Sequence, residues 1–337
     1  MSTLVIGSGL VGSQIVREEL EREANQRIVI LDADPKPDAL DDIFPTSKVE
    51  ILRGDVTDTN NLGEIFRDKG IDTVYHTAAY PGFTITSMQN PSQAIAVNVM
   101  GFVNVLEAAR RWNASRVLYT SSNTISTYIE PSKDDCSSLN KEYSYHRPTT
   151  IYAATKLACE NFGLIYSSSY GIDFRAVRLA AVFGPWRYGG GGGPTNLVRE
   201  MLVNSLAALP MEVSFGDFEY VYSKDAGRGS LLACRADHLR DRIFNIGLGR
   251  LYKLEELVRL IGELIPTSRI RVVRATKDMA APHFEGNTEV RKRMPDPVIA
   301  EPLDLTRSRE QLGYEPKYQM KEALEDYVSF LKTRISP

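Results

Sequence analysis

The residues in this sequence best suited to chemistry are Tyr152 and Lys156, four positions apart in a segment predicted to be helical. Side chains with this spacing share one face of a helix. An ammonium group beside a phenol favours the phenolate, so we expect Lys156 to lower the pKa of Tyr152. Such a tyrosine can take or give the proton of an alcohol while a hydride leaves the same carbon. The spacing alone is common, but Ser122 stands 30 residues before Tyr152, at the end of a predicted strand.

The chain opens with a glycine motif typical of dinucleotide sites. The short apolar strand Leu4–Ile6 leads into G-x-G-x-x-G, and a helical pattern follows. Gly7 permits the tight turn, Gly9 lets a pyrophosphate approach the backbone, and Gly12 lets the helix pack on the strand. The N-terminus of that helix adds N–H groups and partial positive charge. The motif therefore predicts a dinucleotide site at the start of the chain.

Asp32 predicts which dinucleotide is bound. It follows the second predicted strand, Ile28–Leu31, and lies 20 residues beyond Gly12. A carboxylate at this place holds the ribose hydroxyls of adenosine and repels a 2′-phosphate. The next residues, Ala33 and Asp34, offer no arginine to compensate. We therefore expect NAD rather than NADP, the alternative being an aspartate that only caps the next turn.

Strand and helix patterns alternate through the first half of the chain. Further predicted strands are Val49–Leu52, Thr73–His76, Arg116–Tyr119 and Phe174–Leu179. Helical patterns run from Ala94 to Arg111 and onward from Tyr152. This alternation predicts an α/β fold with a doubly wound parallel sheet, helices on both faces, and a ligand at the carboxyl ends of the strands. The residues at or just beyond those ends are Gly7, Asp32, Asp55, Ala78, Ser122 and Leu179.

Composition excludes several classes of protein. The 337 residues carry a net charge of −3, with no basic excess that would favour nucleic acid. No apolar run approaches the ~20 residues of a membrane span, and the first residues lack the basic leader of a signal peptide. The charge and the apolar runs therefore predict neither nucleic-acid nor membrane partners. The three cysteines, Cys136, Cys159 and Cys234, are odd in number and far apart, so we expect free thiols and a cytoplasmic protein.

The histidines do not predict a metal site. His146, His238 and His283 show no metal-ligand spacing. His76 lies within a buried strand and is expected to be a core histidine rather than a catalyst.

With these motifs in order, the sequence resembles the extended short-chain dehydrogenases/reductases of the NAD-dependent epimerase/dehydratase family. The resemblance covers nearly all of the chain. Beyond the glycine motif, Asp32, Tyr152 and Lys156, the matching segments are Gly54–Val56, Val74–Ala79, Asn98–Gly101, Thr120–Ser122, Phe183–Pro185, Phe244–Gly247 and Leu312–Pro316.

The resemblance implies a role for each matching residue. Tyr152 would be the proton-transferring acid/base, Lys156 would lower its pKa and hold the nicotinamide ribose, and Ser122 would hydrogen-bond the reacting oxygen. The implied cofactor-binding residues are Gly7, Gly9, Leu10, Val11, Gly12, Asp32, Asp55, Val56, Thr77, Ala78, Ala79, Asn98, Thr120, Tyr152, Lys156 and Leu179. Weaker candidates for contact with the substrate are Tyr80, Asn123, Thr124, Asn196 and Arg293.

The resemblance also implies a division of the chain. Residues 1–180 with about 218–247 would form the NAD-binding Rossmann domain, and about 181–217 with 248–337 a smaller C-terminal α/β substrate-binding lobe. The glycine run Gly189–Gly193 is either a surface loop or a mobile lid over the substrate, and we favour the lid. In this family two helices pair across a dimer axis, so the second apolar faces of Ala94–Arg111 and Tyr152–Ser169 predict a homodimer.

Departures from the family pattern bear on the substrate. Members that act on nucleotide sugars usually carry an asparagine and an arginine, which help to bind a diphosphate, where this chain has Ala181 and Phe218. Asn196 and Arg293 do match positions that contact the substrate's phosphates. The balance favours a smaller hydroxy substrate that is not a nucleotide.

Dehydratase members usually follow the catalytic serine or threonine with an Asp-Glu pair. Here Ser122 is followed by Asn123 and Thr124, neither of which is a carboxylic acid, so 4,6-dehydration is not expected.

Three hypotheses follow. The first is an NAD-dependent dehydrogenase or reductase acting on a secondary alcohol or ketone of a sugar-like or polyol-like substrate. The second is a UDP-sugar 4-epimerase, which oxidises its substrate only transiently. The third is a non-catalytic protein that senses NAD or acts as a scaffold, and such a protein would not need Ser122, Tyr152 and Lys156.

Overall fold

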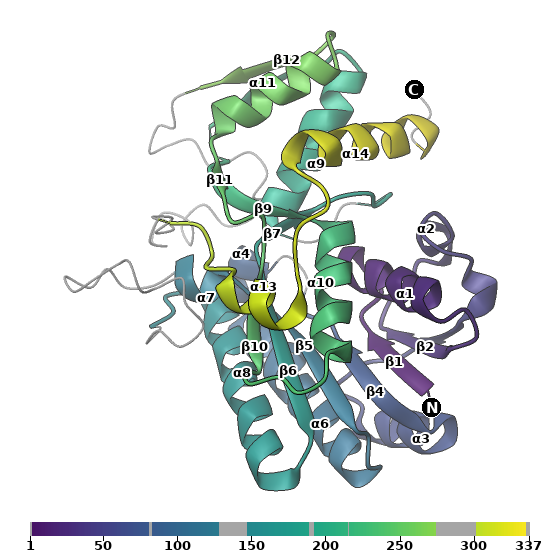
Figure 1. The fold of residues 1–337 in the computed structure, drawn as a ribbon. Coiled ribbons are helices and arrows are strands. Elements are labelled where there is room, and N and C mark those ends of the chain that lie inside the picture. Colours follow the sequence, from purple (N-terminus) through teal and green to yellow (C-terminus); the bar gives the residue numbers. More distant parts are fainter. Residues whose placement is uncertain are drawn as a thin grey trace.

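The computed structural model describes residues 2–80, 83–127, 147–188, 192–214, 216–273 and 301–334. Figure 1 shows a large sheet with helices on both faces and a smaller group of strands and helices above it. The part of the glycine run at 189–191, together with Cys136, His146, His283 and Arg293, lies outside the described residues, so the lid stays a prediction.

The large sheet has seven parallel strands in the order β10-β6-β5-β4-β1-β2-β3. Their bounds are β1 Ser2–Ile6, β2 Arg27–Asp32, β3 Glu50–Arg53, β4 Ile71–His76, β5 Arg116–Ser122, β6 Asp173–Leu179 and β10 Ile243–Ile246. The strand order changes direction between β1 and β4, which is where a doubly wound sheet opens a crevice for its ligand. The predicted fold class is confirmed.

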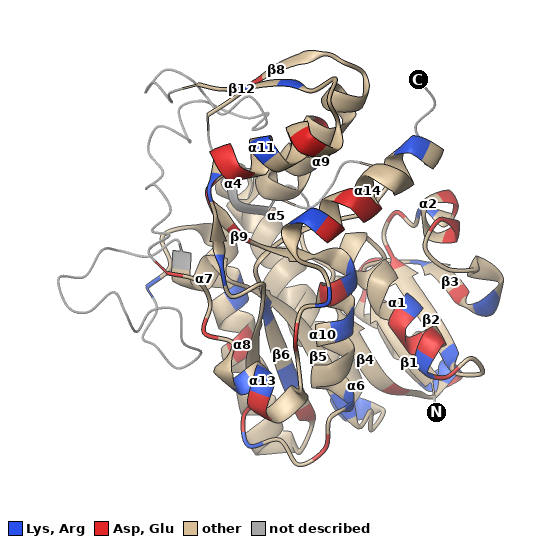
Figure 2. Cartoon of the chain, turned by 45° about the horizontal axis from the view of Figure 1, so that its top comes forward, with Lys and Arg blue, Asp and Glu red and all other residues tan. Residues whose placement is uncertain are grey.

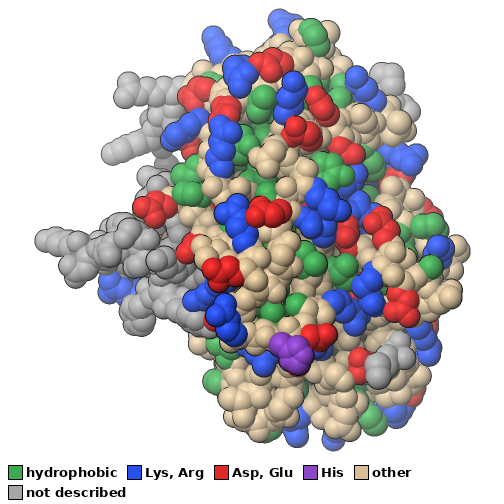
Figure 3. All heavy atoms as spheres, viewed as in Figure 1, with side chains coloured by type: hydrophobic (Ala, Val, Ile, Leu, Met, Phe, Trp, Pro, Cys, Tyr) green, Lys and Arg blue, Asp and Glu red, His purple; other side chains and the backbone are tan. Residues whose placement is uncertain are grey.

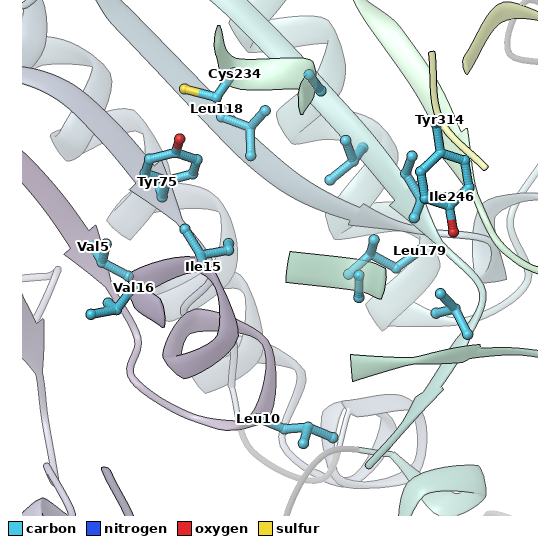
Figure 4. Packing of buried hydrophobic residues seen from close by; sticks show 14 of the residues in the cluster. Val5, Leu10, Ile15, Val16, Tyr75, Leu118, Leu179, Cys234, Ile246 and Tyr314 are labelled. Carbon is cyan, nitrogen blue, oxygen red and sulfur yellow. The ribbon is translucent and has the colours of Figure 1, made fainter. Parts of the chain in front are cut away.

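Alternate residues of the strands enter two different cores. Val5, Tyr75 and Leu118 pack below helices α1 (Leu10–Arg22) and α10 (Ser223–Arg235), and Figure 4 shows this cluster closely. Their chain neighbours Leu4, Val74 and Val117 pack on the other face, against α3 Thr59–Lys69, α6 Gly101–Arg111 and α8 Ile151–Tyr170. Because side chains alternate across a strand, apolar runs of this kind require helices on both faces.

One long helical stretch belongs to the second core. Helix α5 (Pro91–Ile95) continues through the π-helical turn η2 (Ala96–Met100) into α6 (Gly101–Arg111). By length and composition alone it could cross a membrane, and no other helix in the described ranges passes that test. It is 44% buried inside the protein, with Phe102 and Val105 in the core. A core helix meets the same criterion, and packing on the sheet accounts for this one.

The smaller part contains two short sheets. One pairs β11 Leu251–Tyr252, β9 Phe218–Tyr222 and β7 Ala181–Phe183, and the other pairs β12 Arg269–Val272 with β8 Pro210–Val213. Helices α9 Gly193–Leu206, α11 Leu254–Leu264 and α14 Met320–Arg334 share a core with these strands. The short elements that remain are α2 Pro37–Asp41, η1 Thr46–Lys48, α4 Phe83–Gln89, α7 Thr124–Thr127 and α13 Thr306–Leu312.

The predicted division of the chain stays a prediction, although the structure shows how its segments pair. Strand β10 pairs in the large sheet and helix α10 packs against it. Strand β9, which the predicted division assigns to the same domain, pairs instead inside the small sheet. Within β9, Glu219 is buried and accepts hydrogen bonds from the backbone N–H groups of Gly249 (2.8 Å) and Leu303 (2.6 Å). Burial raises the pKa of Glu219 to about 7.

Ion pairs tie the smaller part to α2, the helix that follows Asp32. The side chain of Asp42 is 4% exposed and accepts two hydrogen bonds from Arg187, each 2.8 Å long. Arg334, at the end of α14, places its Nε 2.8 Å from the same carboxylate. Elsewhere on the surface charges of both signs are interspersed in the views of Figures 2 and 3.

Candidate active site

The glycine motif forms the predicted turn between β1 and α1. Gly7 has φ +88°, and a Cβ on it would lie 2.6 Å from the backbone nitrogen of Ala78. A Cβ on Gly12 would lie 1.9 Å from the carbonyl oxygen of Gly7, so both positions require glycine. A Cβ on Gly9 would meet nothing within 4 Å. That open space, at the N-terminus of α1 where Leu10 begins the helix, fits a pyrophosphate.

Asp32 lies beside this turn, as predicted for the residue that holds a ribose. Its Oδ2 accepts hydrogen bonds from the backbone nitrogen of Ser8 (2.6 Å) and from the Ser8 hydroxyl (2.8 Å). Its Oδ1 accepts the N–H of Asp34 (2.9 Å). Oδ2 thus has both lone pairs engaged by Ser8, whereas Oδ1 keeps one lone pair for a ribose hydroxyl. The contribution of Ser8 was missed, because a motif position written x carries no side-chain signal.

The other predicted cofactor residues lie at the neighbouring strand ends or on the helical segments α1 and η2. Thr77 donates to the carbonyl oxygens of Ile6 (3.0 Å) and Gly7 (2.6 Å), which holds Thr77, Ala78 and Ala79 against the glycine turn. The remaining ones are Val11 in the first turn of α1, Asp55 and Val56 after β3, Asn98 in η2, Thr120 in β5 and Leu179 at the end of β6.

Two of these residues already have partners that orient them. Asp55 accepts hydrogen bonds from the backbone and hydroxyl of Thr57, both at 2.8 Å. Asn98 is buried, accepts the N–H of Tyr80 at 2.6 Å and donates to the hydroxyl of Thr155 at 3.1 Å. Asn98 therefore joins the segment after β4 to α8.

Ser122, Tyr152 and Lys156 come from one strand and one helix. Ser122 ends β5, and α8 begins one residue before Tyr152, after Thr150, whose side chain caps the N–H of Ala153 at 3.2 Å. The Ser122 hydroxyl hydrogen-bonds the phenol of Tyr152. It also accepts from the backbone of Thr124 at 3.2 Å. The sequence-based trio is thus brought together.

The pKa values of Tyr152 and Lys156 have other causes than the sequence predicted. Burial raises the pKa of Tyr152 above its ordinary value, and the contribution that lowers it comes from the Ser122 hydrogen bond rather than from Lys156. The ammonium of Lys156 instead donates to the carbonyl oxygen of Thr120 at 2.7 Å and lies 5.6 Å from the centroid of the Tyr152 ring. Burial lowers the pKa of Lys156 to about 8, while Cys159 and Glu160 oppose that change. The expected direct effect of Lys156 on Tyr152 is therefore not seen, because desolvation of the phenol dominates.

The predicted substrate residues divide into three groups. Tyr80, Asn123 and Thr124 lie near the trio, since Tyr80 bonds Asn98 and the N–H of Asn123 donates to the carbonyl of Leu179 at 3.0 Å. Asn196 lies on a separate element, in the first turn of α9. Arg293 is outside the described residues.

Several supporting residues were not predicted. Glu160 and Arg178 form an ion pair between α8 and β6, with each side chain 2% exposed and hydrogen bonds of 2.9 and 2.7 Å. At the end of β3, Arg53 is the register partner of Asp32, a contact between strands that sequence spacing alone does not give. No group of histidine, cysteine, aspartate and glutamate side chains suited to a metal occurs among the residues described.

This arrangement defines an enzyme of the dinucleotide-dependent class, with a Ser, Tyr and Lys trio at the carboxyl ends of a doubly wound sheet. The chain belongs to the NAD dependent epimerase/dehydratase family, whose model matches residues 3–247, and NAD is its cofactor. It is 28% identical to the UDP-glucose 4-epimerase of Lactobacillus helveticus, over 95% of this chain and 93% of that one.

Solved structures of similar proteins align with nearly the whole chain. The UDP-glucose 4-epimerase of Thermus thermophilus, in complex with NAD, aligns with a TM-score of 0.79 and 25% identity over 99% of this chain and 100% of that one. An L-threonine dehydrogenase from Cupriavidus necator aligns with a TM-score of 0.79 and 23% identity, over 98% and 100% respectively, and shares the fold.

Proposed function

We propose that this chain transfers hydride between NAD and a secondary alcohol or ketone of a sugar-like or polyol-like substrate. The observation that carries the proposal is the meeting of Ser122, Tyr152 and Lys156 at the carboxyl edge of the sheet that also holds the glycine turn. The phenol is bonded to the serine hydroxyl, and the ammonium is fixed one helical turn away by a backbone carbonyl. A trio of this kind has one group to move a proton and one to hold the reacting oxygen.

The chain's own groups would divide the work as follows. Gly9 and the first N–H groups of α1 would hold the pyrophosphate of NAD, and Asp32 would hold the adenosine ribose. When bound, NAD supplies the site that accepts or returns the hydride. In the oxidising direction Tyr152, as phenolate, takes the hydroxyl proton of the substrate, while Ser122 donates a hydrogen bond to the same oxygen. Lys156 would hold the nicotinamide ribose, as the family resemblance implies, and the burial of Tyr152 and Lys156 excludes water from them.

The smaller sheet supports a substrate without a diphosphate. Phe218, in place of the arginine that nucleotide-sugar enzymes usually carry, packs edge-on against Tyr220 with ring centroids 5.9 Å apart. A phenyl ring offers no charge to a diphosphate, and leaving one unpaired would be costly.

A UDP-sugar 4-epimerase is the second candidate. The relatives reported above include two UDP-glucose 4-epimerases, and Asn196, which matches a phosphate-contacting position of nucleotide-sugar members, lies in the first turn of α9. Such an enzyme would convert its substrate without net formation of NADH.

Absorbance of NADH separates the two candidates. The purified protein with NAD would be offered free sugars, aldonates, polyols and UDP-sugars in turn. Sustained NADH formation that Tyr152→Phe abolishes supports the dehydrogenase. Conversion of a UDP-sugar to its epimer without net NADH would contradict it and support the epimerase. The Tyr152→Phe protein should still bind NADH, which controls for loss of folding.

We also propose a homodimer built on α8 and the α5–α6 stretch. Both carry large apolar side chains that are exposed in the single chain. These are Ile95 (44%), Met100 (52%), Phe162 (36%), Ile165 (53%) and Tyr170 (55%). A second copy would cover them, and Ile165→Lys should then favour the monomer. Sedimentation equilibrium at micromolar protein tests this, and a wild-type mass near one chain would refute it.

A cytoplasmic location is proposed as well, supported by the buried free thiols Cys159 and Cys234. Cell fractionation would test it.

A further inference from the structure

Four charged side chains meet where β2 and β3 end. Asp32 and Arg53 are register partners in the sheet. The N–H of Asp34 donates to Asp32, which turns the chain so that Asp34 lies beside it. The carboxylate of Asp34 then pairs with Arg53 Nη2 at 2.9 Å and with Lys36 Nζ at 2.5 Å. Two carboxylates and two cations leave this corner neutral.

The two cations matter because of what else could bind them. An arginine beside the adenosine ribose is how related folds accommodate the 2′-phosphate of NADP. Arg53 stands beside the predicted ribose residue as its register partner, and Lys36 lies near it, but both cations are engaged by Asp34. Lys36, and after it Arg53, lowers the pKa of Asp34, so the carboxylate is ionised at neutral pH. A 2′-phosphate would therefore meet a neutralised pair of cations as well as the repulsion of Asp32.

We propose that Asp34 is a second determinant of cofactor specificity, which keeps Arg53 and Lys36 from binding a 2′-phosphate. The inference rests on the proposed adenosine site at Asp32. Preference for NAD then has two separate sources: Asp32 holds the ribose hydroxyls, and Asp34 neutralises the cations that would favour NADP.

Because the side chains of Asp34 and Arg53 are exposed, their ion pair affects cofactor binding rather than folding. Asp34 is 61% and Arg53 70% exposed, and exposed ion pairs contribute little to stability. Lys36 is 44% exposed and also lies 6.0 Å from the centroid of the Tyr188 ring, so it is less free to move than Arg53. Loss of Asp34 should therefore release Arg53 above all, with the fold unchanged.

The test measures binding of NADH and of NADPH to the full chain without substrate. The fluorescence of each reduced cofactor reports its binding. In Asp34→Asn the dissociation constant for NADPH should fall about 5- to 10-fold at low salt, and that for NADH should stay within about twofold. The gain should shrink at high salt, since exposed charges are screened. Adding Arg53→Gln to Asp34→Asn should abolish it.

Asp41→Asn is the matched control. It makes the same change of charge in the same segment, but the carboxylate of Asp41 accepts hydrogen bonds only from the backbone and hydroxyl of Thr46 among the contacts of the described residues. An unchanged NADPH affinity in Asp34→Asn, or an equal gain in Asp41→Asn, would overturn the proposal. If the wild-type protein binds neither cofactor, the assignment of the dinucleotide site fails first, and this proposal fails with it.

Discussion

Gly163 should control both stability and activity, because it sets how closely α8 approaches the sheet. It lies within α8 and faces Phe174 of β6. A methyl group on Gly163 would lie 2.2, 2.3 and 2.5 Å from three carbons of the Phe174 ring. Carbon atoms in contact sit about 3.5–4.0 Å apart, so Gly163→Ala requires α8 or the ring to shift by about 1 Å.

Two opposing effects decide the sign of the change. Alanine in place of glycine within a helix stabilises by about 1 kcal/mol. Overpacking of a filled core costs about 1–3 kcal/mol, and overlap with three atoms of a buried ring belongs at the upper end of that range. The expected net loss is about 2 kcal/mol, or a fall in Tm of about 3 °C.

Activity should fall by more than stability suggests. A shift of α8 moves Tyr152 and Lys156 away from Ser122, which is fixed in β5. Displacement of about 1 Å can reduce the rate about 100-fold, so kcat in Gly163→Ala should fall about 10- to 100-fold. Thermal unfolding and the NADH assay would be measured on the same preparation.

Gly262→Ala in α11 is the matched control. A Cβ there meets nothing within 4 Å, so only the gain in helix propensity remains and Tm should rise by about 1–2 °C with kcat unchanged. In the Gly163→Ala background, Phe174→Leu should restore part of the lost activity by removing the ring. A Gly163→Ala protein as stable and as active as Gly262→Ala would refute the reasoning.

Three further predictions follow from the contacts. Ser122→Ala removes the hydrogen bond that lowers the pKa of Tyr152, so the acidic limb of the pH–rate profile for NADH formation should move to higher pH, with kcat at neutral pH reduced about 100-fold or more. Glu219 has a pKa of about 7 in the folded protein against an ordinary value of 4.5. Its contribution to the free energy of unfolding is therefore complete below pH 4.5 and is lost as the pH rises to 7. Glu219→Gln should flatten the dependence of the unfolding free energy on pH in that window. Asp42→Asn breaks the ion pairs with Arg187 and Arg334, so Tm should fall more in low salt than in high salt, and an equal fall at both would count against these pairs.

The features that sequence predicted well are local. The glycine turn, the strand before it and the acidic residue that ends the second strand are fixed by neighbours in the chain. Glycine is required at Gly7 by its positive φ and at Gly12 by the carbonyl that it contacts, and both constraints act within a few residues. Ser122, Tyr152 and Lys156 were found for a similar reason, since a strand end and a helical spacing place them.

The features that sequence analysis did not predict depend on segments that are far apart in the chain. Arg53 lies beside Asp32 only because β3 pairs next to β2, and the pairing order of a sheet is not written in any single strand. The pKa of Tyr152 depends on how much protein covers the phenol, which the spacing of Tyr152 and Lys156 does not show. The ion pair between Glu160 and Arg178 joins a helix to a strand and has no motif.

His76 shows how burial restricts the charge around Lys156. Both ring nitrogens of His76 are buried without a hydrogen-bond partner among the described residues, and its ring lies near those of Phe102 (5.1 Å) and Tyr119 (5.8 Å). Burial, and secondly the charge of Lys156, lowers the pKa of His76 to about 3. Neutral His76 adds no second cation beneath the site, so the Thr120 carbonyl and the Tyr119 ring can support the charge of the Lys156 ammonium without opposition from this side. A buried cation there in place of neutral His76 would further disfavour the protonated, positively charged form of Lys156.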